Sequence, residues 1–343
     1  MTTTNAKTGV LLVNLGTPDS TSTPDVRKYL REFLMDGRVI DIPFPQRFAL
    51  VNGIIAPFRA PKSAEEYRKL WNKEKGSPLK YYGLEVAEKL QEQLGESFVV
   101  RLAMRYQQPA VKQVLEEMQS CGLSELIVIS LFPQYASATT GSVAQRVMEV
   151  VKDWQVIPSM RFINRFVQEP DYIKLLADVA RPYVEKEQWD HYLFSYHGVP
   201  ERQIYKASCQ NYCQINEACC STYGAENLYC YRAQCFYNSR QLAKALGLAE
   251  NQYTTCFQSR LGKDPWIQPY ADELLKKLPS KGKKKVLAFS PAFVADCLET
   301  TVEVGEAFKE EFLEAGGEKW ELVPSLNNHP DWIRFLAKLV SIK

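Results

Sequence analysis

Gly9-Val-Leu-Leu-Val-Asn-Leu-Gly-Thr-Pro18 is an apolar run that ends in a turn. Residues 10–14 have the length and apolar composition of a buried strand. Residues 25–35 follow with apolar side chains at helical spacing, namely Val26, Tyr29, Leu30 and Phe33. A buried strand, a turn and an amphipathic helix in succession predict the first unit of an α/β fold.

The same alternation continues along the chain. Further strand-like runs lie at residues 98–103, 125–131, 191–195, 252–257, 286–290 and 320–323. Amphipathic helical patterns lie between them, at residues 108–120, 172–187, 233–246, 269–277 and 295–315. Strands that alternate with helices predict parallel sheets covered by helices on both faces.

The length of the chain fits two domains. Its 343 residues exceed one ordinary core, taking roughly 150 residues per domain. The alternation runs once to about residue 160 and again to about residue 325. We therefore predict two Rossmann-like, doubly wound domains, residues 1–165 and 166–328. A last helix within residues 329–343 is expected to pack back on the first domain.

Composition narrows the class of protein. Hydrophobic residues make up 45% and charged residues 24%, as in globular proteins. The formal net charge of +2 and the lack of a long basic block argue against nucleic-acid binding. The N-terminus lacks the pattern of a secretory signal, and apolar runs such as residues 126–132 are too short to span a membrane. We expect a cytoplasmic protein, with contact at a membrane surface left open.

A histidine follows one of the predicted strands, where ligands of open α/β sheets bind. His197 lies just past residues 191–195 and next to Gly198, in a chain with three histidines. An imidazole can accept a proton or bind a metal near neutral pH. A structural histidine that caps the strand end is an equally good interpretation of this segment alone.

An acidic row follows another strand. If a helix begins near residue 295, Asp296, Glu299 and Glu303 recur at i, i+3 and i+7 and share one face. Such a row suits capture of a divalent metal or a proton relay, and mutual repulsion would raise the pKa values of its members. A solvated acidic face at a helix N-terminus is the alternative.

Four blocks together resemble the signature segments of ferrochelatases. They are Leu131-Phe-Pro-Gln-Tyr-Ala-Ser-Ala-Thr-Thr-Gly-Ser142, Phe194-Ser-Tyr-His-Gly-Val-Pro200, Phe257-Gln-Ser-Arg-Leu-Gly-Lys-Asp-Pro-Trp266 and the acidic row through Glu303. The likeness covers nearly the whole chain. It implies a class II chelatase-like pair of Rossmann-like domains with a porphyrin in the cleft between them. It also implies insertion of Fe²⁺ into the porphyrin, most simply protoporphyrin IX, to form haem.

The resemblance assigns site residues by position. His197 matches the family's active-site histidine and Glu299 its catalytic glutamate, with Asp296 and Glu303 on the same helix face; His197 and Glu299 would meet Fe²⁺. The positions that match porphyrin contacts are Leu15, Arg59, Lys62, Tyr67, Ser77, Arg105, Tyr106 and Tyr135. The family's reaction requires a bent porphyrin and removal of two pyrrole protons, for which His197 is placed as acceptor.

Residues 208–231 form a cysteine-rich insert. In a reducing compartment, such crowding indicates a metal rather than disulfides. Some ferrochelatases carry a [2Fe–2S] cluster on an internal segment of this kind, and by that resemblance we expect one here. Candidate ligands are Cys213, Cys219, Cys220 and Cys230, with Cys209 and Cys235 as alternates. A structural zinc site is the alternative.

Residues 44–58 hold more apolar side chains than one packed face requires. The segment matches the active-site lip of the family, so it could admit an apolar substrate, rest on the inner membrane, or be buried against the C-terminal domain.

Two other functions are alternatives to a ferrochelatase. They are a non-catalytic carrier of a tetrapyrrole or metal, and a cobalt or nickel chelatase. The sequence does not decide whether the substrate is protoporphyrin or coproporphyrin, or whether the protein is a monomer or a homodimer.

Overall fold

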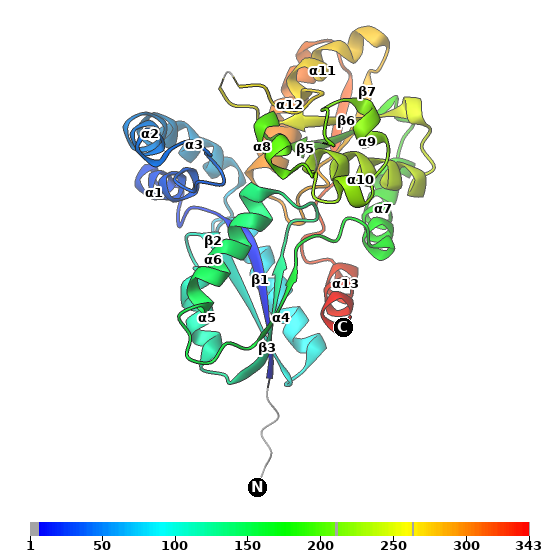
Figure 1. The fold of residues 1–343 in the computed structure, drawn as a ribbon. Helices are drawn as coiled ribbons and strands as arrows, with labels where there is room; N and C mark the ends of the chain where they lie inside the picture. The colour runs from blue at the N-terminus through cyan, green and yellow to red at the C-terminus, as the bar shows by residue number, and fades with distance from the viewer. Residues whose placement is uncertain (1–6, 210–211, 263, 343) are drawn as a thin grey trace. The chain divides into compact units, whose positions relative to one another are not determined.

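The computed structural model describes residues 7–209, 212–262 and 264–342 (Figure 1). It divides into two compact units. Unit 1 comprises Met1–Phe132, Ser137–Arg165 and Asn327–Lys343, and unit 2 comprises Pro133–Ala136 and Phe166–Leu326. Each unit holds one four-stranded sheet, so the prediction of an α/β fold with two doubly wound parallel sheets is confirmed.

The sheet of unit 1 is parallel, with the strand order β2-β1-β3-β4. Its strands are β1 (Lys7–Gly16), β2 (Phe98–Tyr106), β3 (Leu123–Ser130) and β4 (Ser159–Ile163). The central strand β1 pairs Val10 with Val100 on one side and with Ile127 on the other. Because both faces of β1 are covered, its apolar run is continuous rather than alternating.

The helices of unit 1 are α1 (Thr23–Leu34), α2 (Phe44–Ala49), η1 (Leu50–Ile55), α3 (Ala56–Leu70), α4 (Pro78–Leu94), α5 (Val111–Gln119), η2 (Ser137–Gly141), α6 (Ser142–Val151) and α13 (Pro330–Ser341). Helices α4, α5 and α6 contact the sheet, whereas α2, η1 and α3 form a group with α1. Helices α5 and α6 pack on Leu11 and Val13, and α4 contacts β1 and β2. Gly83 of α4 lies against Leu102, so a larger side chain there would clash.

Helix α13 belongs to unit 1, where it packs against α4. Trp332 and Leu336 are fully buried on its inner side. The guanidinium of Arg161 on β4 donates hydrogen bonds to the last carbonyls of the helix, from Nη1 to Leu339 O at 3.2 Å and from Nη2 to Val340 O at 2.5 Å. A cation at a helix C-terminus is favourable, because the free carbonyls there carry partial negative charge.

Unit 2 repeats the plan, with the parallel order β6-β5-β7-β8. Its strands are β5 (His191–His197), β6 (Tyr253–Gln258), β7 (Lys285–Phe289) and β8 (Lys319–Leu322). Its helices are α7 (Pro170–Glu185), α8 (Glu201–Ala207), α9 (Glu217–Ser221), η3 (Ala225–Asn227), α10 (Tyr231–Ala245), η4 (Glu250–Gln252), α11 (Ala271–Lys277), η5 (Pro279–Lys281), η6 (Leu298–Ala307) and α12 (Phe308–Glu314). Phe194 packs toward α7 and α10, and Leu193 packs toward α11 and α12.

The prediction of one helix over residues 295–315 was wrong in its start and in its helix type. Residues Leu298–Ala307 form a π-helix, η6, and the α-helix α12 begins only at Phe308. A π-helix closes i to i+5 hydrogen bonds and is wider than an α-helix, although both leave the same apolar pattern over a short stretch. Across residues 7–209, 212–262 and 264–342, we find no helix with the length and apolar content that a membrane crossing requires.

Candidate functional site

His197 is the last residue of β5 and is half-buried. Its Nδ1 lies 2.7 Å from the carbonyl oxygen of Gly198. A carbonyl can only accept, so the neutral ring carries its proton on Nδ1 and leaves the lone pair of Nε2 to take up a proton or a metal. The backbone therefore selects the tautomer in which Nε2 is the basic nitrogen.

Glu303 on η6 is half-buried, and its carboxylate lies close enough to His197 to feel its charge. The carboxylate accepts hydrogen bonds from Gln258 Nε2 at 3.0 Å and from Ser259 Oγ at 2.8 and 2.7 Å. Burial raises the pKa of Glu303, and repulsion by Glu299 adds to this, while the Ser259 hydrogen bond and the charge of His197 oppose it. Glu303 is thus a carboxyl group able to hold a proton at higher pH than an exposed glutamate.

Gln258 and Ser259, which the sequence analysis did not assign to the site, orient Glu303. Gln258 Oε1 accepts from Ser195 Oγ at 2.7 Å, so its Nε2 must point toward Glu303 and the Glu299 carbonyl, 3.1 Å away. Ser259 has a φ of 65°, a conformation that costs a residue with a Cβ atom energy. Strained backbone of this kind concentrates at functional sites. The only sequence signal was the position of both residues after a strand within a signature block.

Asp296 does not share a helix face with the two glutamates, contrary to the expectation from i, i+3 and i+7 spacing. It precedes η6, where its Oδ1 accepts from the backbone N–H of Ser325 at 3.1 Å and from Thr300 Oγ1 at 3.4 Å. The Asp296 carboxylate therefore accepts hydrogen bonds at the start of η6. Glu299 and Glu303 lie one turn apart on η6 and remain neighbours, as the influence of Glu299 on the pKa of Glu303 shows.

In unit 1, Arg105 and Tyr106 converge on Asp36. Asp36 Oδ2 accepts from Arg105 Nη2 at 2.7 Å, from the Tyr106 hydroxyl at 2.9 Å and from Ser142 Oγ at 2.5 Å. Burial alone would raise the pKa of Asp36, but the hydrogen bond from Ser142 and the charge of Arg105 lower it below its usual value. Both residues expected at the porphyrin are thus held in an ionic network, and the Tyr106 side chain is fully buried.

The other residues expected at the porphyrin are Leu15, Arg59, Lys62, Tyr67, Ser77 and Tyr135. Arg59 and Lys62 are exposed on α3 and lie three positions apart, which places their charges on one side of the helix. Tyr67 and Ser77 are buried, and Ser77 Oγ accepts from Thr17 Oγ1 at 2.9 Å. Only the two cations of this set are openly available to an anionic ligand.

Tyr135 lies in unit 2, separately from that group. Its backbone N–H donates to Gln234 Oε1 at 2.8 Å, and its carbonyl accepts from Gln234 Nε2 at 3.2 Å. Its ring meets the ring of Tyr229 edge-on, with the centroids 5.1 Å apart. The buried Gln234 side chain therefore fixes the backbone of Tyr135 within unit 2.

The cysteine-rich insert of unit 2 brings several thiols together. Cys219 Sγ and Cys220 Sγ are 3.9 Å apart, and Arg232 Nη1 donates to Cys220 Sγ at 3.1 Å. Hydrogen bonds with Cys230 lower the pKa of Cys213 and that of Cys220 to about 6 each. The same two contacts raise the pKa of Cys230. These four thiols are therefore neighbours, although they lie up to 17 positions apart in the chain.

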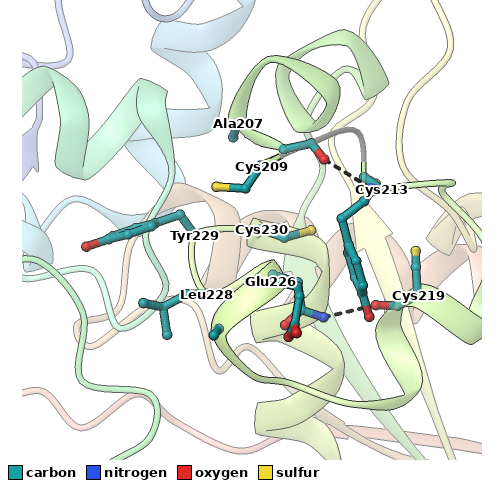
Figure 2. A pocket seen from close by; sticks show the side chains of 12 residues that line it. Ala207, Cys209, Cys213, Cys219, Glu226, Leu228, Tyr229 and Cys230 are labelled. Atoms are coloured by element: carbon teal, nitrogen blue, oxygen red, sulfur yellow. Dashed lines mark hydrogen bonds between the residues drawn. The ribbon is translucent and has the colours of Figure 1, made fainter.

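Figure 2 shows the pocket beside these thiols, with a volume of about 20 Å³. The sulfur of Cys230 faces the side on which Cys213 and Cys219 lie, whereas the sulfur of Cys209 points away. Cys235 is fully buried within α10, and burial raises the pKa of its thiol. Within the described part of the chain, no three or more His, Cys, Asp or Glu side chains form a ready metal site.

Two solved structures share this fold. SirB from Bacillus subtilis with Fe³⁺ superposes with a TM-score of 0.53 at 10% identity, over 97% of this chain and 94% of that chain. DR2241 from Deinococcus radiodurans, a multi-domain protein described as structurally similar to chelatases, superposes with a TM-score of 0.51 at 12% identity, over 98% of this chain and 55% of that one. At these identities the likeness shows a shared fold.

Sequence relationships give the family. The family model for ferrochelatase matches residues 7–343. Ferrochelatase of Legionella pneumophila (strain Lens) is 46% identical over 333 residues, 97% of this chain and 98% of that protein. Ferrochelatase of Coxiella burnetii (strain Dugway 5J108-111) is 44% identical over 335 residues, 98% and 93% of the two chains. The chain belongs to the ferrochelatase family, lyases that insert Fe²⁺ into a porphyrin in haem synthesis.

Proposed function

We propose that His197 accepts the pyrrole protons in the ferrochelatase reaction of this chain and that Glu303 assists their removal. The insertion releases two protons for each Fe²⁺ bound, so a base must stand at the pyrrole nitrogens. The observation that carries the proposal is the hydrogen bond from His197 Nδ1 to the Gly198 carbonyl, because it leaves Nε2 basic. The raised pKa of Glu303 suits a group that receives a proton and then releases it.

Iron is the second substrate, and we assign its contacts to His197 and Glu299. Imidazole nitrogen and carboxylate oxygen are both ligands that ferrous iron accepts. Asp296 serves this group indirectly, since its hydrogen bonds to Ser325 and Thr300 fix the start of η6. Asp296 is therefore a positioning residue in this scheme.

The porphyrin is recognised through its carboxylates. Arg59 and Lys62 are exposed cations on one side of α3, and we assign them to the propionates of protoporphyrin IX. The remaining unit 1 positions support this role. Tyr67 and Ser77 pack beneath the surface, and the Asp36 carboxylate holds Arg105 and Tyr106 in place.

On the thiolate chemistry of the cysteine-rich insert, we propose a [2Fe–2S] cluster held by Cys213, Cys219 or Cys220, and Cys230, with Cys209 or Cys235 as a further ligand. Four contacts already draw Cys213, Cys219, Cys220 and Cys230 together. When bound, such a cluster carries electrons, which the insertion reaction does not use. We therefore assign the thiols a structural role. Arg232, which donates to Cys220 Sγ, would balance their negative charge.

Helices α2 and α3 and the π-helical turn η1 expose apolar side chains that suit a membrane surface. Phe44, Phe48, Ile54 and Phe58 are all more than half exposed, Phe58 by 77%. Single exposed apolar residues are ordinary, but four within 15 positions form a patch. We propose a cytoplasmic protein that touches the inner membrane through residues 44–58.

The decisive experiment is anaerobic turnover with Fe²⁺ and protoporphyrin IX, followed by the haem absorption spectrum. We expect turnover by the unsubstituted protein and none by folded His197→Ala, with porphyrin affinity retained. Glu303→Gln should lower kcat more than it raises KM, because a proton relay acts on the chemical step. Porphyrin binding without turnover would indicate a carrier, and preference for Co²⁺ or Ni²⁺ would indicate another chelatase.

Metal analysis tests the insert separately. Thiolates bound to two ferric ions give visible charge-transfer absorption, whereas closed-shell Zn²⁺ gives none. Anaerobically purified protein should be brown and contain about two iron atoms and two sulfides per chain. Colourless protein that contains one zinc ion per chain would indicate a structural zinc site instead of a cluster.

A further inference from the structure

The buried tyrosine that follows Cys230 contacts the backbone of the candidate catalytic histidine. Tyr231 is the first residue of α10, and its side chain is 7% exposed. Its hydroxyl donates a hydrogen bond to the carbonyl oxygen of His197 at 2.9 Å. The hydroxyl also contacts the thiol of Cys235 on the same helix. Loss of the hydroxyl would therefore leave the His197 carbonyl without this donor.

This hydrogen bond fixes one end of the peptide group between His197 and Gly198. The other end is the Gly198 N–H, which donates to Gln258 O at 2.8 Å. Any larger residue at position 198 would cause strain, since its Cβ atom would lie 2.9 Å from the same carbonyl oxygen. The next carbonyl, that of Gly198, takes the Nδ1 proton of the imidazole. The Gly198 carbonyl belongs to the following peptide group, so the orientation of the first peptide group bears on this acceptor through the backbone of Gly198.

The residues on either side of Tyr231 hold the cysteine-rich insert. Cys230 contacts Cys213 and Cys220. Arg232 donates to Cys220 Sγ at 3.1 Å and to Asn216 O at 2.9 Å. Any shift of the first turn of α10 that follows a change at these thiols must therefore move the Tyr231 hydroxyl.

We propose that Tyr231 is a positioning residue that couples the cysteine-rich insert to the orientation and tautomer of His197. The proposal rests on the proposed role of His197 as proton acceptor. It gives the insert a path to the reaction that needs no electron transfer. The path consists of Cys230, the Tyr231 hydroxyl, and the peptide group between His197 and Gly198.

Tyr231→Phe tests the path by removing one oxygen atom while the ring stays in place. We expect kcat to fall roughly fivefold to tenfold, the effect of one ordinary hydrogen bond, with KM for the porphyrin within about twofold and the iron and sulfide content unchanged. Tyr223→Phe is the matched control, because that hydroxyl donates to Leu228 O at 2.8 Å within the same insert and does not contact His197. It should leave kcat unchanged.

Nitrogen-15 NMR of labelled histidine reads the tautomer without reference to activity. His197 should show a protonated Nδ1 in the unsubstituted protein and in Tyr223→Phe, and a mixture of tautomers in Tyr231→Phe. An unchanged His197 spectrum in Tyr231→Phe would overturn the proposal. If the spectrum changes but His197→Ala retains turnover, the positioning stands and the proposed role of His197 fails instead.

Coupling to the insert is tested by a double-mutant cycle. Cys230→Ser should perturb the His197 spectrum in the unsubstituted background but add little in the Tyr231→Phe background. Additive effects would separate the insert from the histidine and overturn the coupling. One check needs no variant: the Tyr231 hydroxyl proton should exchange slowly with solvent, and rapid exchange would contradict the hydrogen bond.

Discussion

The pH dependence of turnover should move in a defined direction when Ser259 is changed. The Ser259 hydroxyl donates to both oxygens of the Glu303 carboxylate and so favours its ionised form. A hydrogen bond to a charged group contributes about 1.5–3 kcal/mol, and about 1.4 kcal/mol shifts a pKa by one pH unit. Ser259→Ala should therefore raise the already elevated pKa of Glu303 further and move the pH profile in the same direction.

Ser259→Gly separates this electrostatic effect from backbone strain. At a φ of 65°, an L-residue costs about 1–2 kcal/mol relative to glycine. Both variants lose the hydroxyl, but only the glycine variant loses the strain. We expect the same shift in the pH profile from both, with Ser259→Gly more stable than Ser259→Ala by about 1 kcal/mol.

The assays are the pH profile of kcat/KM and urea unfolding as a function of pH. Because the folded-state pKa of Glu303 lies above the unfolded-state value, ionising this carboxyl costs stability. The free energy of unfolding should therefore decline as pH rises from the unfolded-state pKa to the folded-state pKa, over a wider range in both Ser259 variants. Glu303→Gln should lack this decline. A profile unmoved by Ser259→Ala, or equal stability of the two variants, would refute the reasoning.

Three further outcomes follow from the structure. Asp36→Asn should cost about 3 kcal/mol in urea unfolding, because the half-buried Arg105 cation loses its partner. Since the pKa of Asp36 is lowered in the folded state, the stability that it contributes should be lost as pH falls through that pKa, and the variant should lack this acid loss. Phe58→Ser should weaken sedimentation with anionic vesicles several-fold; equal binding would exclude the apolar patch as the contact. Cys220→Ser should lower iron and sulfide content, whereas exposed Cys121→Ser should not.

The strands were predictable because burial leaves a direct mark on sequence. Residues 10–13 and 126–129 are continuous apolar runs, and the structure places them in the two central strands of a parallel sheet. The edge strand β4 was missed, since its residues are only half-buried and include Arg161. The amphipathic pattern of residues 295–315 showed that a helix was present but not that its first part is a π-helix.

The sequence singled out chemical groups for the candidate site but could not give their arrangement. His197 and the glutamates were selected from strand ends and signature blocks, and their roles stay predictions. The hydrogen bonds from Gln258, Ser259 and Tyr231 arise from tertiary contacts that leave no periodic trace. The positive φ of Ser259 could not be predicted from sequence either, because serine seldom adopts this conformation. Spacing alone also misplaced Asp296.

The position of α13 has a consequence for synthesis on the ribosome. Unit 1 begins with β1 but is completed only by α13, whose Trp332 and Leu336 fill its core. Unit 2 is nearly continuous, from residue 166 to residue 326. During translation, all of unit 2 therefore emerges before the helix that completes unit 1. Until α13 is made, the surface of α4 that receives it lacks its partner helix, so this apolar surface is a point of exposure during synthesis.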